Sequence, residues 1–215
     1  MLFQKEILIR VGHIIPVMIA KALPDRDSYL TIVAGTEILA VLPKKYAQKE
    51  YRVGEGAFAA VFSMDNRRIV LSQRSHHYFK RILEGVLAPV FQKGIVKIKR
   101  IAVVENCRFT KVALESTNGV DPADPVAECL PFLKECKEFT DYTITLIPHS
   151  PDIREYIKNA LAPAPSRLVR RVIYFEKPRE ADVYVEGSPG LFFGKGGVNV
   201  AAAAKLTRVR INIKL

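Results

Sequence analysis

The stretch LFFGKGGVNVAAAAKLTRVRINI, residues 191–213, decides how the C-terminal part of this chain folds. At its centre the turn Gly194-Lys195-Gly196-Gly197 separates a short apolar segment from a helical run, Val198 to Leu206. Glycine permits positive φ angles and a close approach to the backbone. The following helix presents free N–H groups and the positive end of its dipole. With the charge of Lys195 at its tip, the turn is suited to holding a phosphate group.

Working outward from the turn, the hydrophobic pattern predicts one order of elements twice. The second occurrence begins with a helix over Asp152 to Leu161, for which Ser150 is the expected cap and Pro151 stands in the first turn. The linker Ala162 to Pro165 follows that helix. Its other elements are strands Leu168 to Phe175 and Ala181 to Glu186, a short helix, the helix Val198 to Leu206, and a strand from Val209 to Ile213.

The first occurrence begins with a helical stripe from Tyr78 to Leu87. Its other elements are strands Ile95 to Val104 and Phe109 to Glu115, a helical region Pro125 to Phe139 made of two short helices, and a strand from Tyr142 to Ile147. The repeated order, helix–strand–strand–helix–helix–strand, is that of a type II KH domain, which clamps single-stranded nucleic acid at a GxxG loop.

The residues before Ser75 read as strands separated by turns. Ile7-Leu8-Ile9 leads into the first of five expected strands, which are Ile14 to Ala20, Tyr29 to Val33, Ile38 to Leu42, Ala57 to Phe62 and Arg68 to Leu71. Five short strands suit a small barrel of the oligonucleotide-binding (OB) type, although many small all-β domains share this pattern. We therefore predict an α+β multidomain chain, with an all-β OB barrel over residues 1–74 and two type II KH domains (α-β-β-α-α-β) over residues 75–149 and 150–215.

Basic residues are concentrated towards the two ends of the chain. Lys and Arg outnumber Asp and Glu by 33 to 22, a net charge of +11. Residues 1–74 hold 11 basic and 7 acidic residues (+4), residues 75–165 hold 12 and 11 (+1), and residues 166–215 hold 10 and 4 (+6). A polyanionic partner explains this distribution, and a domain that is merely basic is the alternative.

Several other functions lack sequence support. The turn has neither the spacing nor the Ser/Thr of an NTPase phosphate loop, and it follows a helix rather than the strand of a dinucleotide fingerprint. A plain helix–helix turn remains an alternative. No catalytic motif, metal-ligand spacing or cofactor motif occurs, so we expect no enzyme, no metal and no cofactor. Cys107, Cys129 and Cys136 are expected to be buried free thiols of a cytoplasmic protein. The apolar stretch His13 to Ala20 is too short to span a membrane.

Basic and polar residues near the turn are candidate RNA contacts together with Gly194, Lys195, Gly196 and Gly197. Asn199, Lys205 and Arg208 follow the turn, with Arg210 beyond them, and solvated surface is the alternative for each. Lys97, Lys99 and Arg100 lie on a predicted strand, where a solvated strand face is nearly as well supported. In the barrel, Tyr29, Phe58 and Phe62 could stack bases, but packing is favoured for them.

These stretches resemble the RNA-binding core of the bacterial transcription factor family NusA. Residues 191–213 resemble the second KH domain of that family, and Ile69 to Ala102, with IVLSQRSHH and GIVKIKRIA, resembles its junction of barrel and first KH domain. Thr110 to Ala113 and Val120-Asp121-Pro122 continue the likeness. The resemblance implies a monomeric cytoplasmic regulator of elongation, pausing, termination and antitermination, which binds nascent single-stranded RNA and associates with RNA polymerase and other elongation factors.

Two departures from the family pattern shape the alternatives. No glycine occurs from Val120 to Glu186, so Glu128 to Pro131 or Pro131 to Lys134 replaces the first GxxG loop, and Glu128, Glu135 and Glu138 would repel phosphate. The family's N-terminal polymerase-binding domain is also missing from this sequence, which is then either a fragment or a variant. A protein-docking module, or a ribosome-assembly factor that binds RNA without acting on polymerase, is therefore the alternative function.

Overall fold

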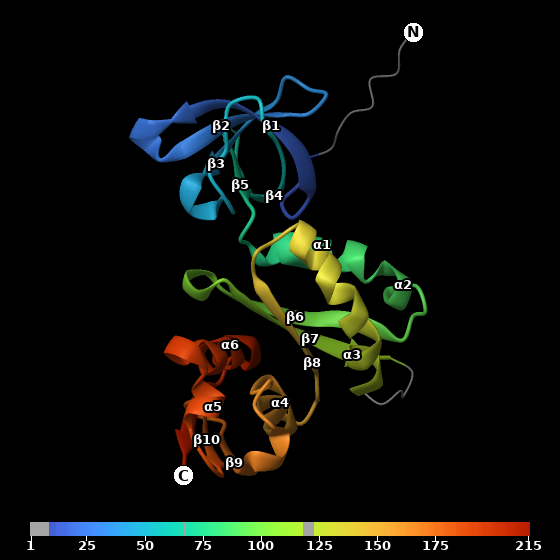
Figure 1. Cartoon of the computed structure of the whole chain (residues 1–215), viewed down its shortest axis with the longest axis vertical. Coiled ribbons are helices and arrows are strands. Elements are labelled where there is room, and N and C mark those ends of the chain that lie inside the picture. The colour runs from blue at the N-terminus through green and yellow to red at the C-terminus, as the bar shows by residue number, and fades with distance from the viewer. Residues whose placement is uncertain (1–8, 67, 118–122) are drawn as a thin grey trace. The chain divides into compact units, whose positions relative to one another are not determined.

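The computed structural model describes residues 9–66, 68–117 and 123–215. The chain divides into two compact units, one ending at Ile82 and the other running from Leu83 to Leu215 (Figure 1). No helix in the described ranges is both long and apolar enough to cross a membrane.

Five strands of the first unit close into a barrel, as the strand and turn pattern predicts. They are β1 (Ile14–Leu23), β2 (Ser28–Val33), β3 (Leu39–Pro43), β4 (Gly56–Met64) and β5 (Ile69–Ser72), in the order β1-β2-β3-β5-β4 (Figure 1). The 3-10 helices η1 (Pro24–Arg26) and η2 (Lys44–Tyr46) follow β1 and β3. A closed barrel of five strands has no free sheet edges and is consistent with an OB-like domain. Of the strand residues expected earlier in the chain, Ile7 and Leu8 lie outside the described residues.

The barrel core follows from the two-residue period of its strands. Ile15, Val17 and Ile19 of β1 point inward and are at most 5% exposed, whereas Met18 between them is 44% exposed. Strands β1 and β4 pair antiparallel, with Ile15 opposite Ala59, and both of these residues belong to one apolar cluster.

The second unit contains two three-stranded sheets. The first consists of β6 (Val96–Val104), β7 (Phe109–Ser116) and β8 (Thr143–Pro148), with β7 in the middle and β8 parallel to it. Helices α1 (His76–Val86), which begins before the unit boundary, and α2 (Ala88–Phe91) precede this sheet. The 3-10 helix η3 (Glu105–Cys107) joins β6 to β7.

The predicted helical region before β8 consists of two pieces of different type. Helix α3 (Ala123–Cys129) is followed directly by η4 (Leu130–Glu138), a 3-10 helix. Pro131 lies in the first turn of η4, where its missing N–H group leaves no hydrogen bond unmade.

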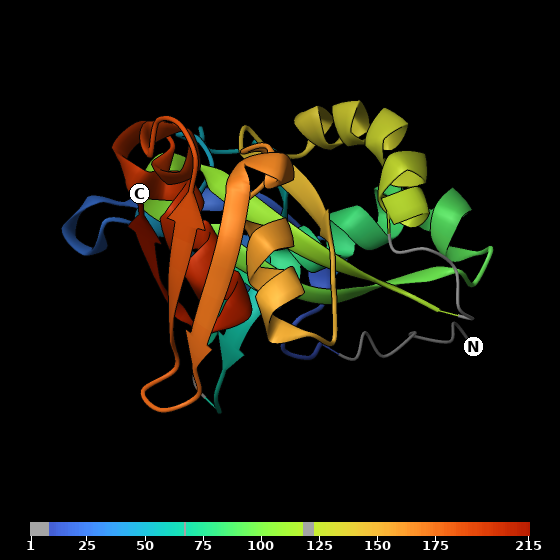
Figure 2. The ribbon, with the colours of Figure 1, turned by 90° about the horizontal axis from the view of Figure 1, so that it is seen from below.

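The second sheet has the same topology as the first. It consists of β9 (Val169–Phe175), β10 (Glu180–Val185) and β11 (Arg210–Lys214), with β10 in the middle and β11 parallel to it (Figure 2). Helix α4 (Ile153–Ala160) and the 3-10 helix η5 (Ser166–Leu168) precede it. Helices α5 (Gly190–Phe193), η6 (Lys195–Gly197) and α6 (Val198–Thr207) lie between β10 and β11 in the chain. The helix–strand–strand–helix–helix–strand order therefore occurs twice.

The expected cap of helix α4 was wrong. Asp152 is its N-cap, because the Asp152 Oδ1 accepts a hydrogen bond of 2.9 Å from the backbone N–H of Arg154. Ser150 instead accepts a hydrogen bond from the N–H of Asp152. An N-cap side chain accepts from an N–H group two or three residues further on, as Asp152 does from Arg154, and Ser150 stands too early in the chain.

An apolar cluster spans the two halves of the second unit. It joins Ala113 of β7 and Ile147 of β8 to Ile157 of α4, Phe192 of α5 and Ala203 of α6, and all five are fully buried. The helices around the glycine turn therefore rest on the sheet of the first half.

Candidate nucleic-acid interface

The glycine turn connects α5 to α6 through a backbone that only glycine adopts easily. Gly194 has φ 68° and ψ 175°, a region essentially restricted to glycine. Gly196 and Gly197 have φ of 62° and 75°. The Gly197 N–H donates to the Gly194 carbonyl at 3.0 Å and closes the turn. Three of its four residues are thus glycine for conformational reasons, and only Lys195 carries a side chain.

The outer side of the turn combines a cation with apolar surface. Lys195 is exposed, and Leu191 and Phe193 of α5 are 53% and 39% exposed. Phe192 between them is fully buried. Leu191 and Phe193 are not predictable as contacts from the sequence, because a Leu-Phe-Phe run does not show which of its members faces the core.

Asn199, one of the predicted RNA contacts, lies beneath the turn rather than on its surface. It is only 4% exposed, and its Nδ2 donates to the carbonyls of Phe192 at 3.0 Å and Leu161 at 2.7 Å. Its Oδ1 accepts a hydrogen bond of 2.6 Å from the Lys111 ammonium. Asn199 therefore ties the end of α5 to the end of α4 from inside.

The Lys111 side chain crosses from the first half of the second unit into the second half. It is fully buried, and its Nζ donates to the carbonyls of Ala160 and Ala162 as well as to Asn199. These three acceptors match the three N–H donors of an ammonium group. Burial lowers the pKa of the Lys111 ammonium to about 7. Lys111 thus supports the base of the turn from strand β7.

Lys205 and Arg100, also predicted RNA contacts, bond across the same two halves. The Lys205 Nζ donates to the Val103 carbonyl at 2.6 Å, and the Arg100 Nη1 donates to the Leu206 carbonyl at 3.1 Å. Lys205 is nonetheless an exposed residue. Arg208 is exposed and forms the C-cap of α6 with a φ of 59°.

Lys97 and Lys99 share one carboxylate. Their ammonium groups lie 2.9 Å and 2.8 Å from the two oxygens of Glu115 on the neighbouring strand β7. Hydrogen bonds from Lys99 and then Lys97 lower the pKa of the Glu115 carboxyl to about 2. The carboxylate is therefore ionised at neutral pH and offsets part of the positive charge on this face.

The segment that replaces the first glycine loop is acidic outside and contains two thiols inside. Glu128, Glu135 and Glu138 are exposed, whereas Cys129 and Cys136 are buried free thiols. Burial raises the pKa of both thiols to about 11. Cys107 is exposed, contrary to the prediction, because it ends the short helix η3 between two strands.

The three barrel aromatics differ in their surroundings. Tyr29 is 2% exposed and packs edge-on against Tyr51, with ring centroids 5.9 Å apart. Phe58 and Phe62 are 58% and 40% exposed, and Phe62 contacts the ring of Tyr46. Packing accounts for Tyr29, while Phe58 in particular presents its ring to solvent.

Metal binding finds no support in the described residues, where no three His, Cys, Asp or Glu side chains are placed to hold an ion. The site is instead a positively charged glycine turn with an apolar flank and a buried polar support.

Comparison with curated proteins gives three alignments to proteins named transcription termination/antitermination protein NusA. The one from Borreliella burgdorferi is 30% identical over 81% of this chain and 37% of its own length. Those from Thermus thermophilus and Halalkalibacterium halodurans are 32% and 26% identical over 67% and 83% of this chain, and 38% and 47% of their own lengths. These alignments support a NusA-like family. The chain spans less than half the length of these NusA-like relatives.

Other comparisons add little to the NusA likeness. No protein-family model matches the chain. A solved structure described as APE1850 covers 63% of this chain with a TM-score of 0.45 and 19% identity. A multidomain protein with nucleic acid binding domains from Streptococcus pneumoniae covers 59% of it with a TM-score of 0.28 and 13% identity. These scores are too low to inform the fold or the function.

Proposed function

We propose that this chain is a single-stranded RNA-binding factor that modulates transcript elongation, pausing, termination or antitermination. The glycine turn carries the proposal, because it joins an exposed Lys195 to a backbone that a phosphate can approach closely. The names of the NusA-like relatives support the transcriptional role. The net charge of +11 supports a polyanionic partner.

In this proposal the barrel over residues 1–74 is followed by two type II KH domains, over residues 75–149 and 150–215. The repeated element order and the central position of β7 and β10 in their sheets support this division. RNA backbone lies on Gly194 to Gly197, where Lys195 and the first N–H groups of α6 contact phosphate. Unstacked bases pack against the exposed Leu191 and Phe193.

The predicted polar contacts then divide into two roles. Lys195 and Arg208 are exposed and contact the RNA strand directly. Asn199, whose amide is engaged inside the protein, positions the turn. Lys205 and Arg100 hold the two halves together through backbone carbonyls while leaving part of their charge at the surface.

RNA engagement is asymmetric between the two proposed KH domains. The first lacks the glycine turn, and its replacement carries exposed Glu128, Glu135 and Glu138, which repel phosphate. The first KH domain contributes to RNA binding only through Lys97 and Lys99 on strand β6. RNA polymerase and other elongation factors are the proposed protein partners of a monomeric, cytoplasmic chain.

Glu115→Gln is expected to strengthen RNA binding by about threefold at low salt, because it removes a negative charge and releases two lysines for phosphate contacts. Affinity for a single-stranded RNA pool would be compared with that of Glu105→Gln, which removes an exposed carboxylate from η3. If the two variants bind alike, the Lys97 and Lys99 face does not contact RNA.

The direct test of the proposal is a Lys195→Asp, Gly196→Asp double variant. Two carboxylates at the turn repel phosphate, so affinity for single-stranded RNA should fall at least about tenfold, or roughly 1.4 kcal/mol. The measurement is a binding titration at several salt concentrations, with duplex DNA for comparison and circular dichroism to check the fold.

Lys93 and Gly94 offer a matched control. Gly94 has a φ of +69°, and nothing lies within 4 Å of a Cβ added there, as at Gly196. Lys93→Asp, Gly94→Asp therefore makes the same substitutions at another left-handed glycine, and it also removes the ion pair of Lys93 with Glu128. Equal losses in both double variants would show a general charge effect and would remove the turn from the proposal.

Docking of a partner protein is the second candidate function, and the exposed surface of η4 with its C-cap Phe139 favours it. Leu130 and Phe139 are 53% and 42% exposed beside the acidic residues, an arrangement that suits a partner protein better than RNA. Partners that stay bound to the chain after nuclease treatment would support docking. Co-purification of RNA polymerase separates a transcription factor from a ribosome-assembly factor.

A further inference from the structure

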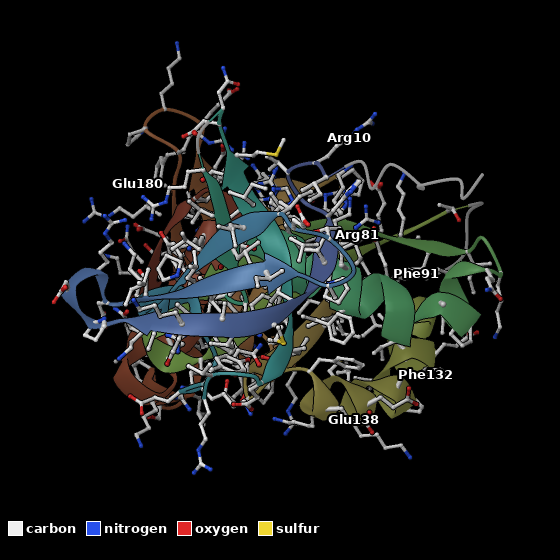
Figure 3. The ribbon with its side chains drawn as sticks, turned by 90° about the horizontal axis from the view of Figure 1, so that it is seen from above. Arg10, Arg81, Phe91, Phe132, Glu138 and Glu180 are labelled. Carbon is white, nitrogen blue, oxygen red and sulfur yellow. The ribbon has the colours of Figure 1, made fainter. Side chains whose placement is uncertain are left out.

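A basic pocket lies in the first unit, where the segment before β1 meets the start of α1. It is lined by residues 10–13 and by His77, Lys80 and Arg81, and it has a volume of about 200 Å³. The spacing of the three helical residues, i, i+3 and i+4, places them on one face of α1. Figure 3 labels Arg10 and Arg81 on these two segments.

Backbone hydrogen bonds hold the first of these segments in place. The Gly12 N–H donates to the Val61 carbonyl at 2.8 Å, and the Val61 N–H donates to the His13 carbonyl at 2.8 Å. Gly12 has a φ of +88°, and a Cβ atom added there would lie 3.1 Å from the Nδ1 of His77. Glycine thus lets the segment pass close to the His77 ring. The basic residues of this segment and those of α1 therefore line the same pocket.

The lining gathers positive charge. Arg10, Lys80 and Arg81 are exposed cations, and His13 and His77 are half-buried. Among the described residues that line the pocket, none is acidic. The neighbouring His76 ring lies 3.9 Å from the His77 ring. Burial, with smaller contributions from His77 and Lys80, lowers the pKa of His76. Cationic and imidazole side chains therefore make up the polar part of the described lining.

The size of the pocket selects the kind of anion. At about 200 Å³ it is smaller than the roughly 300–1,000 Å³ of pockets that enclose whole small-molecule ligands. Val11 is its one aliphatic side chain among the described lining residues. Arg and Lys side chains bind phosphate oxygens with charge-assisted hydrogen bonds, and Arg can do so with two parallel bonds. The lining therefore suits a phosphate or diphosphate group rather than a base or sugar.

We propose that this basic pocket is a phosphate-binding site, separate from the glycine turn, for the phosphate groups of a nucleotide or of an RNA strand. The proposal does not rest on the proposed function, because the pocket belongs to the first unit and the glycine turn to the second.

The test uses the full chain, inorganic pyrophosphate as the probe, and NMR of the histidine side chains. Pyrophosphate up to about 10 mM should shift the His13 and His77 resonances to saturation, which corresponds to a submillimolar to millimolar Kd. An Arg10→Gln, Lys80→Gln variant should bind about fivefold or more weakly, because two of the cationic donors are lost. Lys21→Gln, Arg26→Gln removes the same two charges from exposed barrel positions and should bind as wild type does.

No shift in the wild-type protein, or equal weakening in both double variants, would overturn the proposal. The Lys195→Asp, Gly196→Asp variant should keep the pyrophosphate shift, so failure of RNA binding at the turn is distinguishable from failure here. Two further arms identify the source of the phosphate. If RNA affinity falls more in the Arg10→Gln, Lys80→Gln variant than in its control, the RNA strand supplies the phosphate. If RNA affinity is unchanged while nucleoside triphosphate competes with pyrophosphate, a free nucleotide supplies it.

Discussion

Replacement of Lys111 by methionine is expected to lower the free energy of unfolding by about 3 kcal/mol. The side chains are similar in length, so the change removes the ammonium group with little loss of volume. The carbonyls of Ala160 and Ala162 and the Oδ1 of Asn199 then lose the donor that each has in the folded protein. Each buried acceptor without a donor costs about 1–3 kcal/mol, and relief from burying a charge offsets part of the sum.

Urea unfolding followed by circular dichroism measures this loss. Lys137→Met is the control, because Lys137 is exposed on η4 and its replacement should change stability by less than about 0.5 kcal/mol. A Lys111→Met protein as stable as wild type would mean that the three acceptors find other partners at no cost.

The Lys111 effect should also depend on pH. The pKa is about 7 in the fold against 10.5 ordinarily, so between these values the unfolded chain holds a proton that the folded chain lacks. Wild-type stability then rises with pH in this window through Lys111. Lys111→Met lacks that rise, so the stability gap between the two proteins should widen from pH 7 to pH 9.

Gly194→Ala should destabilise the second unit by about 3 kcal/mol and reduce RNA affinity by about tenfold. The backbone at Gly194, with φ 68° and ψ 175°, strains any residue that has a Cβ. The added atom would also lie 3.0 Å from the Cβ of Asn199. Because Asn199 is held from three sides inside the protein, it cannot move away without breaking its hydrogen bonds.

Gly196→Ala is the matched comparison. Gly196 has φ 62° and ψ 21°, a left-handed conformation that alanine adopts at a cost of about 1 kcal/mol. Nothing lies within 4 Å of a Cβ added at Gly196. Thermal and urea unfolding of both variants would test the difference. Equal destabilisation would show that contact with Asn199 does not constrain the turn.

Local sequence patterns predict most of the elements of this fold. Period-two alternation places β1 and β4, and the change to a helical period after Ser75 places α1, because both signals arise from neighbours along the chain. The limits of such patterns appear at the cap of α4, where Asp152 takes the place expected of Ser150. They appear again at η4, which is a 3-10 helix although its composition predicts only helix in general.

Local sequence patterns predict only part of the candidate site. Glycine spacing identifies the turn, because the positive φ angles at Gly194, Gly196 and Gly197 favour glycine. The sequence does not show that Asn199 lies beneath the turn, nor that Leu191 and Phe193 flank it on the outside. A polar residue beside a glycine turn can point either way, and its direction depends on what packs against it.

The sequence by itself determined the barrel strands, the repeated order of helices and strands, and the glycine turn, since each depends on residues within a few positions of one another. Only the tertiary structure decided that Lys111 supports that turn. Its ammonium bonds to Ala160, Ala162 and Asn199, the last of them 88 residues away in the chain. Such a contact exists only when separate segments pack around one buried charge, and local sequence carries no signal for that packing.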